Sequence, residues 1–510
     1  MACVVAQYPS FRVHDKLLRN VTRNNPKSIN MNINFTRFSI IGLHGKYDIE
    51  IPIFDNKIIL IGVNGLGKTT VINFIYFVLT DQWSRLMDYD FSAIELTLNG
   101  REIVISRGDI ASKIGAQRRH NRLVARYSYK SPYPRSVVSK IFSHPLFRHL
   151  RNKSDFPMEG VLHKIAEDTG VSALMIRRMI ADFPSDAQEE LFSEFHEPRC
   201  FTELSEILEN GGIKQVIYMP TYRRIEQDIK AIFPLASEEE LKKLATSMGV
   251  INKSGPRGYV ELVQFGMQDV ETILATELGL IENKTREQLT GLTASYLQDI
   301  IRSRADTIEP SVIASMTDPV VERVLKRVEE NTLSAEDKSA IQNSIRRMRA
   351  GDGAPAVARD LYLTYFFSRL LEIYTDLYRR EEAIRRLEET CNSYLVGKKL
   401  RYNDGNFTAR VFDRDGAELS WRALSSGEKQ VASLFTHLYL SRETSQIVLI
   451  DEPELSLSVR WQKNLLPDIL NSGNCDLLVA VTHSPFIYTN SLRGHAVDLA
   501  KLIKPHTSKS

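Results

Sequence analysis

Residues 57–79 read KIILIGVNGLGKTTVINFIYFVL, and this stretch decides the fold. An apolar run leads into Gly62–Thr69, which fits the pattern GxxxxGK[ST], and apolar residues at helical spacing follow. The glycines let backbone amides turn inward, and the start of the next helix adds partial positive charge. The stretch therefore predicts a strand, a loop that cradles a polyphosphate, and a helix. A simple glycine turn is the alternative, and the two matching flanks argue against it.

The expected ligand of this loop is ATP together with Mg²⁺. Lys68 would reach the β- and γ-phosphates, and the Thr69 hydroxyl would bind Mg²⁺. The predicted nucleotide contacts in this segment are Asn64, Gly65, Leu66, Gly67, Lys68, Thr69 and Thr70.

Two further apolar runs end in residues suited to hydrolysis. Residues 447–454, IVLIDEPE, read as a buried strand that ends in two adjacent carboxylates. Asp451 suits Mg²⁺ binding, and Glu452 suits polarising the water that attacks the γ-phosphate. Residues 477–485, LLVAVTHSP, predict another strand that ends at His483, a γ-phosphate sensor if it lies at the carboxyl edge of a parallel sheet. Acids that only cap a strand, and a structural histidine, are the alternatives.

A fourth polar stretch, LSSGEKQ at residues 424–430, precedes the helical run KQVASLFTHLYL. This stretch is a second candidate anion-binding site, with two hydroxyls, a glycine and the start of a helix. The first amides of a helix lack partners within the helix and can bind an anion. The predicted nucleotide contacts here are Ser425, Ser426, Gly427 and Glu428. A serine that only caps the helix is the alternative.

Other patterns place these motifs in an α/β fold. A hairpin is predicted around Asn99-Gly100, a dipeptide that readily supplies positive φ in a two-residue turn. Residues 270–395 have mostly helical spacing and read as a helical insertion or lid, too short for long coiled-coil arms. Further strands are predicted within 33–42, 47–53, 214–226, 259–264, 407–421, 446–450 and 477–482.

The composition is that of a soluble globular protein. The 510 residues include 43% hydrophobic residues, and 66 Lys and Arg against 63 Asp and Glu give a net charge of only +3. The four cysteines have no paired spacing typical of zinc sites or disulfide frameworks. Neither a signal peptide nor an apolar run long enough to span a bilayer is recognisable, so we expect a cytoplasmic protein that does not contact membranes.

Three weaker signals remain. Residues 113–153 contain eleven Lys or Arg and no Asp or Glu, which favours a nucleic acid or an acidic partner about as much as a solvated face. Residues 163–180 have a faint helix-turn-helix cadence, although a plain helix pair is the favoured interpretation. Arg223 and Arg224 could contact phosphate, contact another subunit, or pair with Glu226.

The four motifs in this order resemble the ABC-type ATPases of the SMC, RecF and overcoming-lysogenization-defect branch. More closely, PTYRRIE (220–226), VQFGMQDVE (263–271), LSSGEKQ and DEPELSLSVRWQ resemble the PtuA family of ATPases from Septu and some retron antiphage systems. The resemblance implies an ABC-type head made of a mixed-sheet lobe and a helical lobe. It divides the chain into a lead-in segment (1–32), the N-terminal part of the head (33–270), a helical insertion (271–395) and the C-terminal part of the head (396–510).

In such ATPases the signature motif, to which LSSGEKQ corresponds here, closes from one subunit over nucleotide held by the P-loop of another. Ser425, Ser426 and Gly427 would therefore act in trans, and a homodimer or higher homo-oligomer is implied. The resemblance also implies a separately encoded HNH nuclease partner and no nuclease centre in this chain, with DNA or reverse-transcribed nucleic acid as a further candidate partner. Ser458 stands where a histidine is usual in this branch, and a Mg²⁺-binding glutamine would be Gln264 or Gln268. A DNA-clamping ATPase of repair or chromosome maintenance, and a scaffold that uses ATP as a structural ligand, are the alternatives.

Overall fold

The computed structural model describes residues 33–130, 133–142, 144, 158–181, 198–213, 215–220, 258–261, 267–302, 310–327, 333–350, 358–441 and 445–507. The predictions for the lead-in segment 1–32, for Arg223, Arg224 and Glu226, and for Gln264 lie outside these residues.

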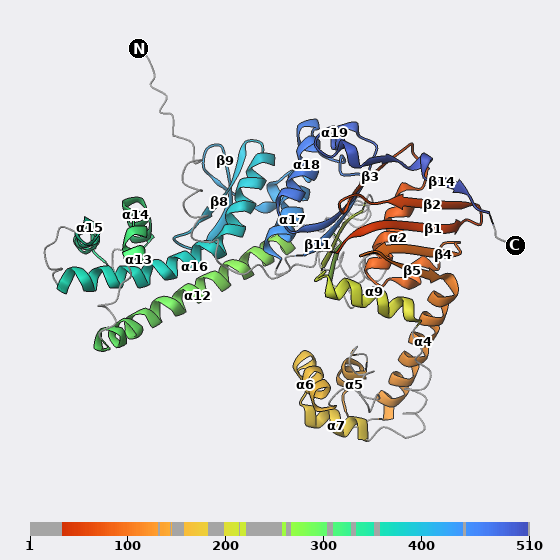
Figure 1. Cartoon of the computed structure of the whole chain (residues 1–510), viewed down its shortest axis with the longest axis horizontal. Coiled ribbons are helices and arrows are strands. Elements are labelled where there is room, and N and C mark those ends of the chain that lie inside the picture. Colours follow the sequence, from red (N-terminus) through yellow and green to blue (C-terminus); the bar gives the residue numbers. More distant parts are fainter. Residues whose placement is uncertain are drawn as a thin grey trace, which may run out of the picture.

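A six-stranded sheet of order β13-β3-β12-β11-β6-β7 lies at the centre of the head (Figure 1). All its neighbouring strands pair in parallel. Along β11, Ile447 and Leu449 belong to one hydrophobic core, and Val448 and Ile450 to the other, because successive residues of a strand point to opposite faces. The sheet is therefore buried on both faces, as is usual for parallel sheets. Its strands are β3 (Lys57–Ile61), β6 (Gln215–Met219), β7 (Gly258–Glu261), β11 (Gln446–Asp451), β12 (Cys475–Thr482) and β13 (Ala496–Asp498).

One face of this sheet shares a core with helix α2 (Lys68–Leu79) and with a five-stranded sheet of order β14-β2-β1-β4-β5. The predicted hairpin is confirmed, since Leu98 pairs with Arg101 and both Asn99 (φ 51°) and Gly100 (φ 75°) have positive φ. The strands are β1 (Phe35–Leu43), β2 (Tyr47–Pro52), β4 (Ala93–Leu98), β5 (Arg101–Ser106) and β14 (Ile503–Pro505), and the helices α3 (Trp83–Leu86) and α9 (Arg199–Asn210) join this core.

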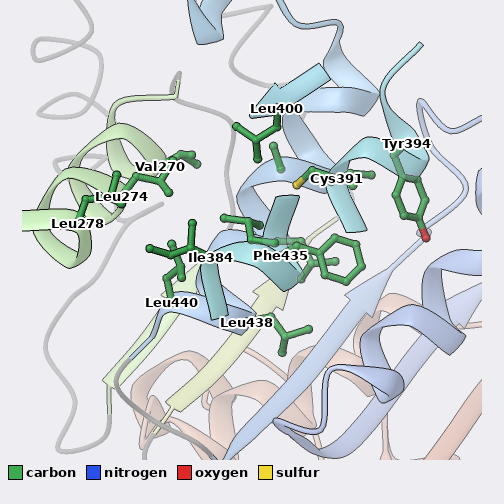
Figure 2. Packing of buried hydrophobic residues seen from close by; sticks show 14 of the residues in the cluster. Val270, Leu274, Leu278, Ile384, Cys391, Tyr394, Leu400, Phe435, Leu438 and Leu440 are labelled. Carbon is green, nitrogen blue, oxygen red and sulfur yellow. The ribbon is translucent and has the colours of Figure 1, made fainter. Parts of the chain in front are cut away.

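The other face of the central sheet is covered by helices. Figure 2 shows how side chains of α12, α16 and α17 meet in this second core, with Leu274, Ile384 and Phe435 among them. These helices are α12 (Gln268–Ile301), α16 (Ala358–Tyr394) and α17 (Ser426–Leu440), and α18 (Val459–Asn471) and α19 (Pro485–Tyr488) add residues to the same core. A small sheet, β8 (Lys398–Asn403), β9 (Thr408–Asp413) and β10 (Glu418–Leu419), follows α16, and short 3-10 turns occupy η5 (Trp421–Ala423), η6 (Arg493–His495) and η7 (Leu499–Lys501).

Residues 271–395 are mostly helical, as predicted, and they form an arm. Helices α12 and α16 have 34 and 37 residues and run side by side away from the central sheet (Figure 1). At 1.5 Å per residue each is roughly 50 Å long. Helices α13 (Pro310–Ser315), α14 (Asp318–Arg327) and α15 (Ala335–Ala350) pack against α16 or each other along this arm.

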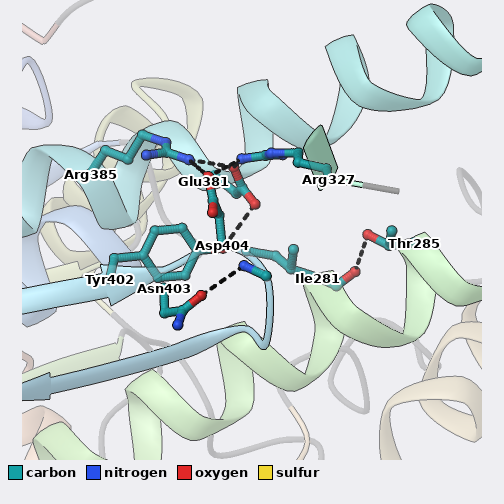
Figure 3. Close-up of polar contacts among 9 residues, drawn as sticks. Ile281, Thr285, Arg327, Glu381, Arg385, Tyr402, Asn403 and Asp404 are labelled. Atoms are coloured by element: carbon teal, nitrogen blue, oxygen red, sulfur yellow. Dashed lines mark hydrogen bonds and ion pairs between the residues drawn. The ribbon is translucent and has the colours of Figure 1, made fainter. Parts of the chain in front are cut away.

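An ionic cluster centred on the buried Glu381 links the arm to the small sheet (Figure 3). Arg327 of α14 donates hydrogen bonds to Glu381 (2.7 Å) and Asp404 (2.6 Å), and Arg385 donates to the same two carboxylates at 3.0 and 2.9 Å. Glu381 is fully buried and also accepts a hydrogen bond from the Tyr402 hydroxyl at 2.8 Å. Burial and the neighbouring charge of Glu381 raise the pKa of Tyr402. Two guanidinium groups thus offset two carboxylates where α14, α16 and the β8–β9 turn meet.

A second projection begins at β5. Helix α4 (Arg107–Lys130) leads away from the five-stranded sheet to α5 (Arg135–Phe142), α6 (Met158–Thr169) and α7 (Ala173–Ala181) (Figure 1). These last three helices have a small core of their own.

Candidate nucleotide-binding site

The predicted phosphate-binding loop lies between β3, which ends at Ile61, and α2, which begins at Lys68. Gly65 (φ 83°) and Gly67 (φ 89°) both have left-handed backbone conformations. A residue with a β-carbon would be strained at either position, so the loop shape depends on these glycines. The predicted order of strand, loop and helix is confirmed.

Lys68 is buried at the start of α2 and points back into this loop. Its ammonium group donates hydrogen bonds to the carbonyls of Gly62 and Val63, both at 3.0 Å. Burial lowers the pKa of Lys68, and the charges of three carboxylates oppose that shift; these are Glu452, Asp451 and Glu454. The loop lysine therefore lies within electrostatic reach of the acids that follow β11, although nearly 400 residues separate them in the sequence.

The two adjacent acids after β11 occupy different environments. Asp451 is fully buried as the last residue of the strand. Glu452 has a left-handed backbone (φ 50°), and its N–H donates to the Val481 carbonyl at 2.8 Å. Such a conformation costs a non-glycine residue about 1–3 kcal/mol and persists where the surroundings enforce it. The turn leaves the Glu452 side chain a quarter exposed, so one acid is enclosed and the other is accessible.

His483 lies at the end of β12, the neighbour of β11 in the sheet. Its Nε2 atom is 3.7 Å from a carboxylate oxygen of Glu452, and its side chain is 30% exposed. The structure thus brings together Lys68, Asp451, Glu452 and His483, which the sequence assigned to phosphate, Mg²⁺ and water.

Glu454 is part of this site and the sequence reasoning did not assign it a role. Its carboxylate accepts hydrogen bonds from the Thr482 hydroxyl (2.7 Å) and from the backbone N–H groups of His483 (2.8 Å) and Ser484 (3.1 Å). It therefore fixes the segment that carries His483 to the loop that carries Glu452. The available signal was a third acid in IDEPE, two positions after Glu452.

The predicted anion-binding stretch at 424–430 begins helix α17. Ser425 is the N-cap, and its hydroxyl accepts the N–H of Glu428 at 3.4 Å, while the Glu428 carboxylate accepts the N–H of Ser425 at 2.7 Å. This is a capping box, so Ser425 caps the helix, and the nucleotide contact of this stretch stays a prediction. Lys398 donates to the same carboxylate at 2.7 Å and Val396 N–H donates at 3.3 Å. Both Glu428 oxygens are thus engaged within the chain.

These contacts also fix the ionisation of Glu428. Burial opposes ionisation, but the hydrogen bonds from Lys398 and Ser425 outweigh it and hold the pKa of Glu428 below its ordinary value. Within the chain this side chain shapes the start of α17, and its nucleotide contact stays a prediction.

Gly427 sets the distance between α17 and the loop that follows Glu454. A β-carbon on Gly427 would lie 2.3 Å from the carbonyl oxygen of Ser456 and 3.3 Å from the Trp461 ring. Ser456 itself has a left-handed backbone (φ 66°). Ser458, which stands where the resemblance implied a histidine, is the N-cap of α18 and accepts the Trp461 N–H at 3.4 Å.

The two helix starts that could bind phosphate belong to opposite faces of the central sheet. Helix α2 contributes Val71, Phe74 and other residues to the core shared with the five-stranded sheet. Helix α17 contributes Val431 and Phe435 to the core on the other face. Helix α17, which begins with Ser426 and Gly427, therefore lies on the opposite face of the sheet from α2, which begins with Lys68.

Donors for Mg²⁺ are present in small number. Asp451 supplies a buried carboxylate and Thr69 an exposed hydroxyl in the first turn of α2. Within the residues that the structure describes, no group of three or more His, Cys, Asp or Glu side chains could hold a metal ion by itself. This set fits Mg²⁺, which usually takes one or two protein ligands and completes its shell with phosphate oxygens and water. Gln268 is the first residue of α12.

Exposed apolar side chains accompany all four motifs. Val63 in the phosphate loop is 71% exposed, and Val396, whose N–H contacts Glu428, is 64% exposed. Val459 at the start of α18 and Phe486 after His483 are also exposed. Scattered exposed apolar residues are ordinary on a protein surface, so this set by itself identifies no interface.

Comparison with known proteins supports this type of site. Residues 302–489 match the family model described as "AAA domain, putative AbiEii toxin, Type IV TA system". The matched segment includes the signature stretch, the β11 acids and His483, and it amounts to roughly a third of the chain. No curated protein matches the chain.

Two solved structures are similar at low level. One is the Smc head domain with an extended coiled coil bound to the C-terminal domain of ScpA from Pyrococcus furiosus, with 12% identity, a TM-score of 0.33, and coverage of 93% of this chain and 96% of that one. The other is the Smc head domain with a coiled coil and joint from Pyrococcus yayanosii, with 15% identity, a TM-score of 0.29, and coverage of 90% and 93%.

The ABC-type P-loop ATPase fold of this chain is evident from its own strand order and motif placement. In the described part of the chain, no helix has the length and apolar character needed to cross a bilayer.

Proposed function

We propose that two copies of this chain close around two molecules of ATP, with each site built from the phosphate loop of one copy and the Ser425–Gly427 stretch of the other. The observation that carries this proposal is the placement of α2 and α17 on opposite faces of the central sheet. A phosphate bound at the start of α2 needs a second anion-binding helix from elsewhere, and a second copy provides it. The exposed Val63 and Val396 would be covered in the same step.

The chemistry assigned to each residue follows from its environment. The loop amides and Lys68 would hold the β- and γ-phosphates, and Thr69 with Asp451 would hold Mg²⁺, which supplies charge neutralisation at the phosphates. Glu452 is accessible and lies next to His483, so it would accept a proton from the attacking water while His483 orients toward the γ-phosphate. Glu454 would position His483 through the backbone.

A mixing experiment tests the composite site. Lys68→Ala and Ser426→Arg should each abolish ATP hydrolysis alone, because the first removes the phosphate ligand and the second blocks the signature stretch. In a 1:1 mixture, half of the dimers combine both variants, and each of these has one intact site of two. We therefore expect about a quarter of wild-type turnover in the mixture for a two-fold symmetric dimer. No recovery in mixtures where mixed dimers are detected by native mass measurement would contradict the composite site.

A second variant separates binding from hydrolysis. Glu452→Gln removes the proton acceptor and preserves the size of the side chain, so it should still bind ATP and should accumulate as a closed dimer in size-exclusion chromatography with ATP. Lys68→Ala is the matched control and should remain open under the same conditions. Wild-type turnover by Glu452→Gln would remove Glu452 from the proposed role.

For the finer biological role, we propose that closure of the heads controls a separately encoded HNH nuclease in cytoplasmic antiphage defence. The resemblance of the four motif segments to the PtuA family supports this role. A DNA-clamping ATPase of the SMC or RecF kind is the second candidate, and the short helical arm formed by α12 and α16 argues against long-range tethering in it. Purification of the native complex and measurement of its mass separates the two. A bound nuclease subunit supports the first, and its absence together with DNA-stimulated ATP turnover supports the second.

A further inference from the structure

The three helices at the end of α4 form a unit distinct from both cores of the head (Figure 1). Seven side chains make its core, and each is at most 6% exposed; they are Val138, Ile141, Val161, Leu162, Ile165, Ile176 and Met179. Because this unit packs within itself, the ATP-binding head does not need it for burial of its own core. A functional reason for the unit must therefore lie on its outer surface.

Helices α6 and α7 are joined in the manner of a helix-turn-helix. Only Gly170, Val171 and Ser172 separate them, and Gly170 has a left-handed backbone (φ 69°). The Ser172 hydroxyl accepts the N–H of Met175 at 3.3 Å and so caps α7. A tight turn with glycine between two short helices that pack on a third is the arrangement of this motif. The sequence favoured a plain helix pair, and the third helix and the left-handed turn now favour the motif.

Helix α5 contacts the end of α6 next to the turn. Lys140 of α5 donates a hydrogen bond to the carbonyl of Thr169, the last residue of α6, at 2.7 Å. Val138 and Ile141 of the same helix pack against the α6 and α7 side chains. The angle between α6 and α7 is thus held by a third element, which a recognition helix requires.

The outer face of α7 is cationic. Ile176 and Met179 point into the core, whereas Leu174, Arg177 and Arg178 are exposed. The helix contains no Asp or Glu. On the neighbouring helix α6, Asp168 contacts His144 (3.3 Å) and Lys164 (3.6 Å), and Glu167 contacts Lys164 at 3.0 Å. Lys164 thus contacts both of these α6 carboxylates.

Helix α4 extends the positive charge toward the head. Arg118, Arg119 and Arg122 are exposed along it. Lys113, the first residue of the basic segment 113–153, does not contribute, because its ammonium lies 4.2 Å from the centre of the Phe201 ring and 3.9 Å from Asp81. The described cationic side chains on this projection therefore lie beyond Lys113, on α4 and on α7.

We propose that α5–α7 is a helix-turn-helix module that binds double-stranded DNA, with α7 in the major groove and the α4 arginines at the phosphate backbone. Arginine is the side chain best suited to guanine edges, and an exposed leucine suits the thymine methyl group. Duplex RNA fits poorly because its major groove is too narrow for a helix. This goes beyond ATP-driven head closure and gives the chain a DNA contact that does not depend on nucleotide.

The test uses the full-length protein and a fluorescein-labelled duplex DNA of about 30 base pairs, with binding followed by fluorescence anisotropy at several salt concentrations. The double variant Arg177→Glu/Arg178→Glu should bind at least about tenfold more weakly at every salt concentration, because the side chains proposed to reach the base edges are removed and their charge is reversed. Both side chains are exposed, so the fold of the variant should be kept, and circular dichroism checks this. A milder variant, Arg177→Gln/Arg178→Gln, should show the same direction of change.

The matched control is Lys284→Glu/Arg286→Glu on α12. It makes the same change in net charge, but on exposed residues of the arm that α12 and α16 form. It should bind DNA within about threefold of the wild type, since phosphate contacts act locally. Equal loss in both double variants would overturn the proposal, because binding would then follow net charge alone. Tighter binding of single-stranded DNA or of duplex RNA than of duplex DNA would also overturn it. Loss of ATP hydrolysis in Lys68→Ala with unchanged DNA binding would support the independence of the two sites.

Discussion

Gly427→Ala is the change for which the structure gives the sharpest expectation. The new methyl carbon would lie 2.3 Å from the Ser456 carbonyl oxygen, where ordinary contact begins near 3.4 Å, so α17 or the Ser456 loop must move by roughly 1 Å. Neither can move freely, because Val431 and Phe435 of α17 and Leu457 next to Ser456 are buried in the same core. Overpacking of this kind destabilises the fold by about 1–3 kcal/mol. The higher helix propensity of alanine offsets about 0.5–1 kcal/mol of this loss. We expect a net loss of about 1–2 kcal/mol.

Gly279→Ala is the matched control in α12. Nothing lies within 4 Å of the position that its β-carbon would occupy, so only the helix-propensity gain remains and stability should rise by about 0.5–1 kcal/mol. Urea denaturation followed by tryptophan fluorescence measures both variants, and Trp461 next to Gly427 reports the local change. ATP turnover should fall in Gly427→Ala, because the signature stretch is displaced, and stay unchanged in Gly279→Ala. Equal stability and equal turnover of the two variants would refute the close contact between α17 and the Ser456 loop.

Three further predictions concern the arm and the site. Glu381→Ala should lower the free energy of unfolding in urea by about 2–3 kcal/mol because it leaves the partly buried Arg327 and Arg385 with Asp404 as their one carboxylate in this cluster, whereas Glu382→Ala, which removes an exposed ion pair one residue away, should cost less than about 0.5 kcal/mol. Asp360 has its pKa lowered to about 2, chiefly by the Arg347 hydrogen bond. Its stabilising effect is therefore complete above about pH 4 and is lost as the pH falls toward 2, so the melting temperature of Asp360→Asn should fall less than that of the wild type over this range. Glu454→Gln turns an amide group toward backbone N–H donors and should lower kcat for ATP by about 10–100-fold with little change in KM.

The local elements of this protein follow from local sequence. The loop glycines, the alternating apolar runs and the Asn99-Gly100 turn each specify a backbone shape within a few residues, and the structure places them as predicted. The helical spacing of 271–395 was equally clear, but not that two of these helices would form a projecting arm. Periodicity reports which face of a helix is apolar, and it does not report what that face packs against.

The sequence alone therefore determined the type of chemistry, because the residue types and flanks of each motif are local. Tertiary structure decided which motifs share a site. Pairing of β3 with β12, more than 400 residues apart, brings Lys68 near Glu452 and His483, whereas α2 and α17 belong to opposite faces of the same sheet. It also gave Glu454 its role and turned a faint cadence at 163–180 into a braced three-helix unit. The physical reason is that packing partners are chosen by long-range burial, which no short stretch of sequence contains.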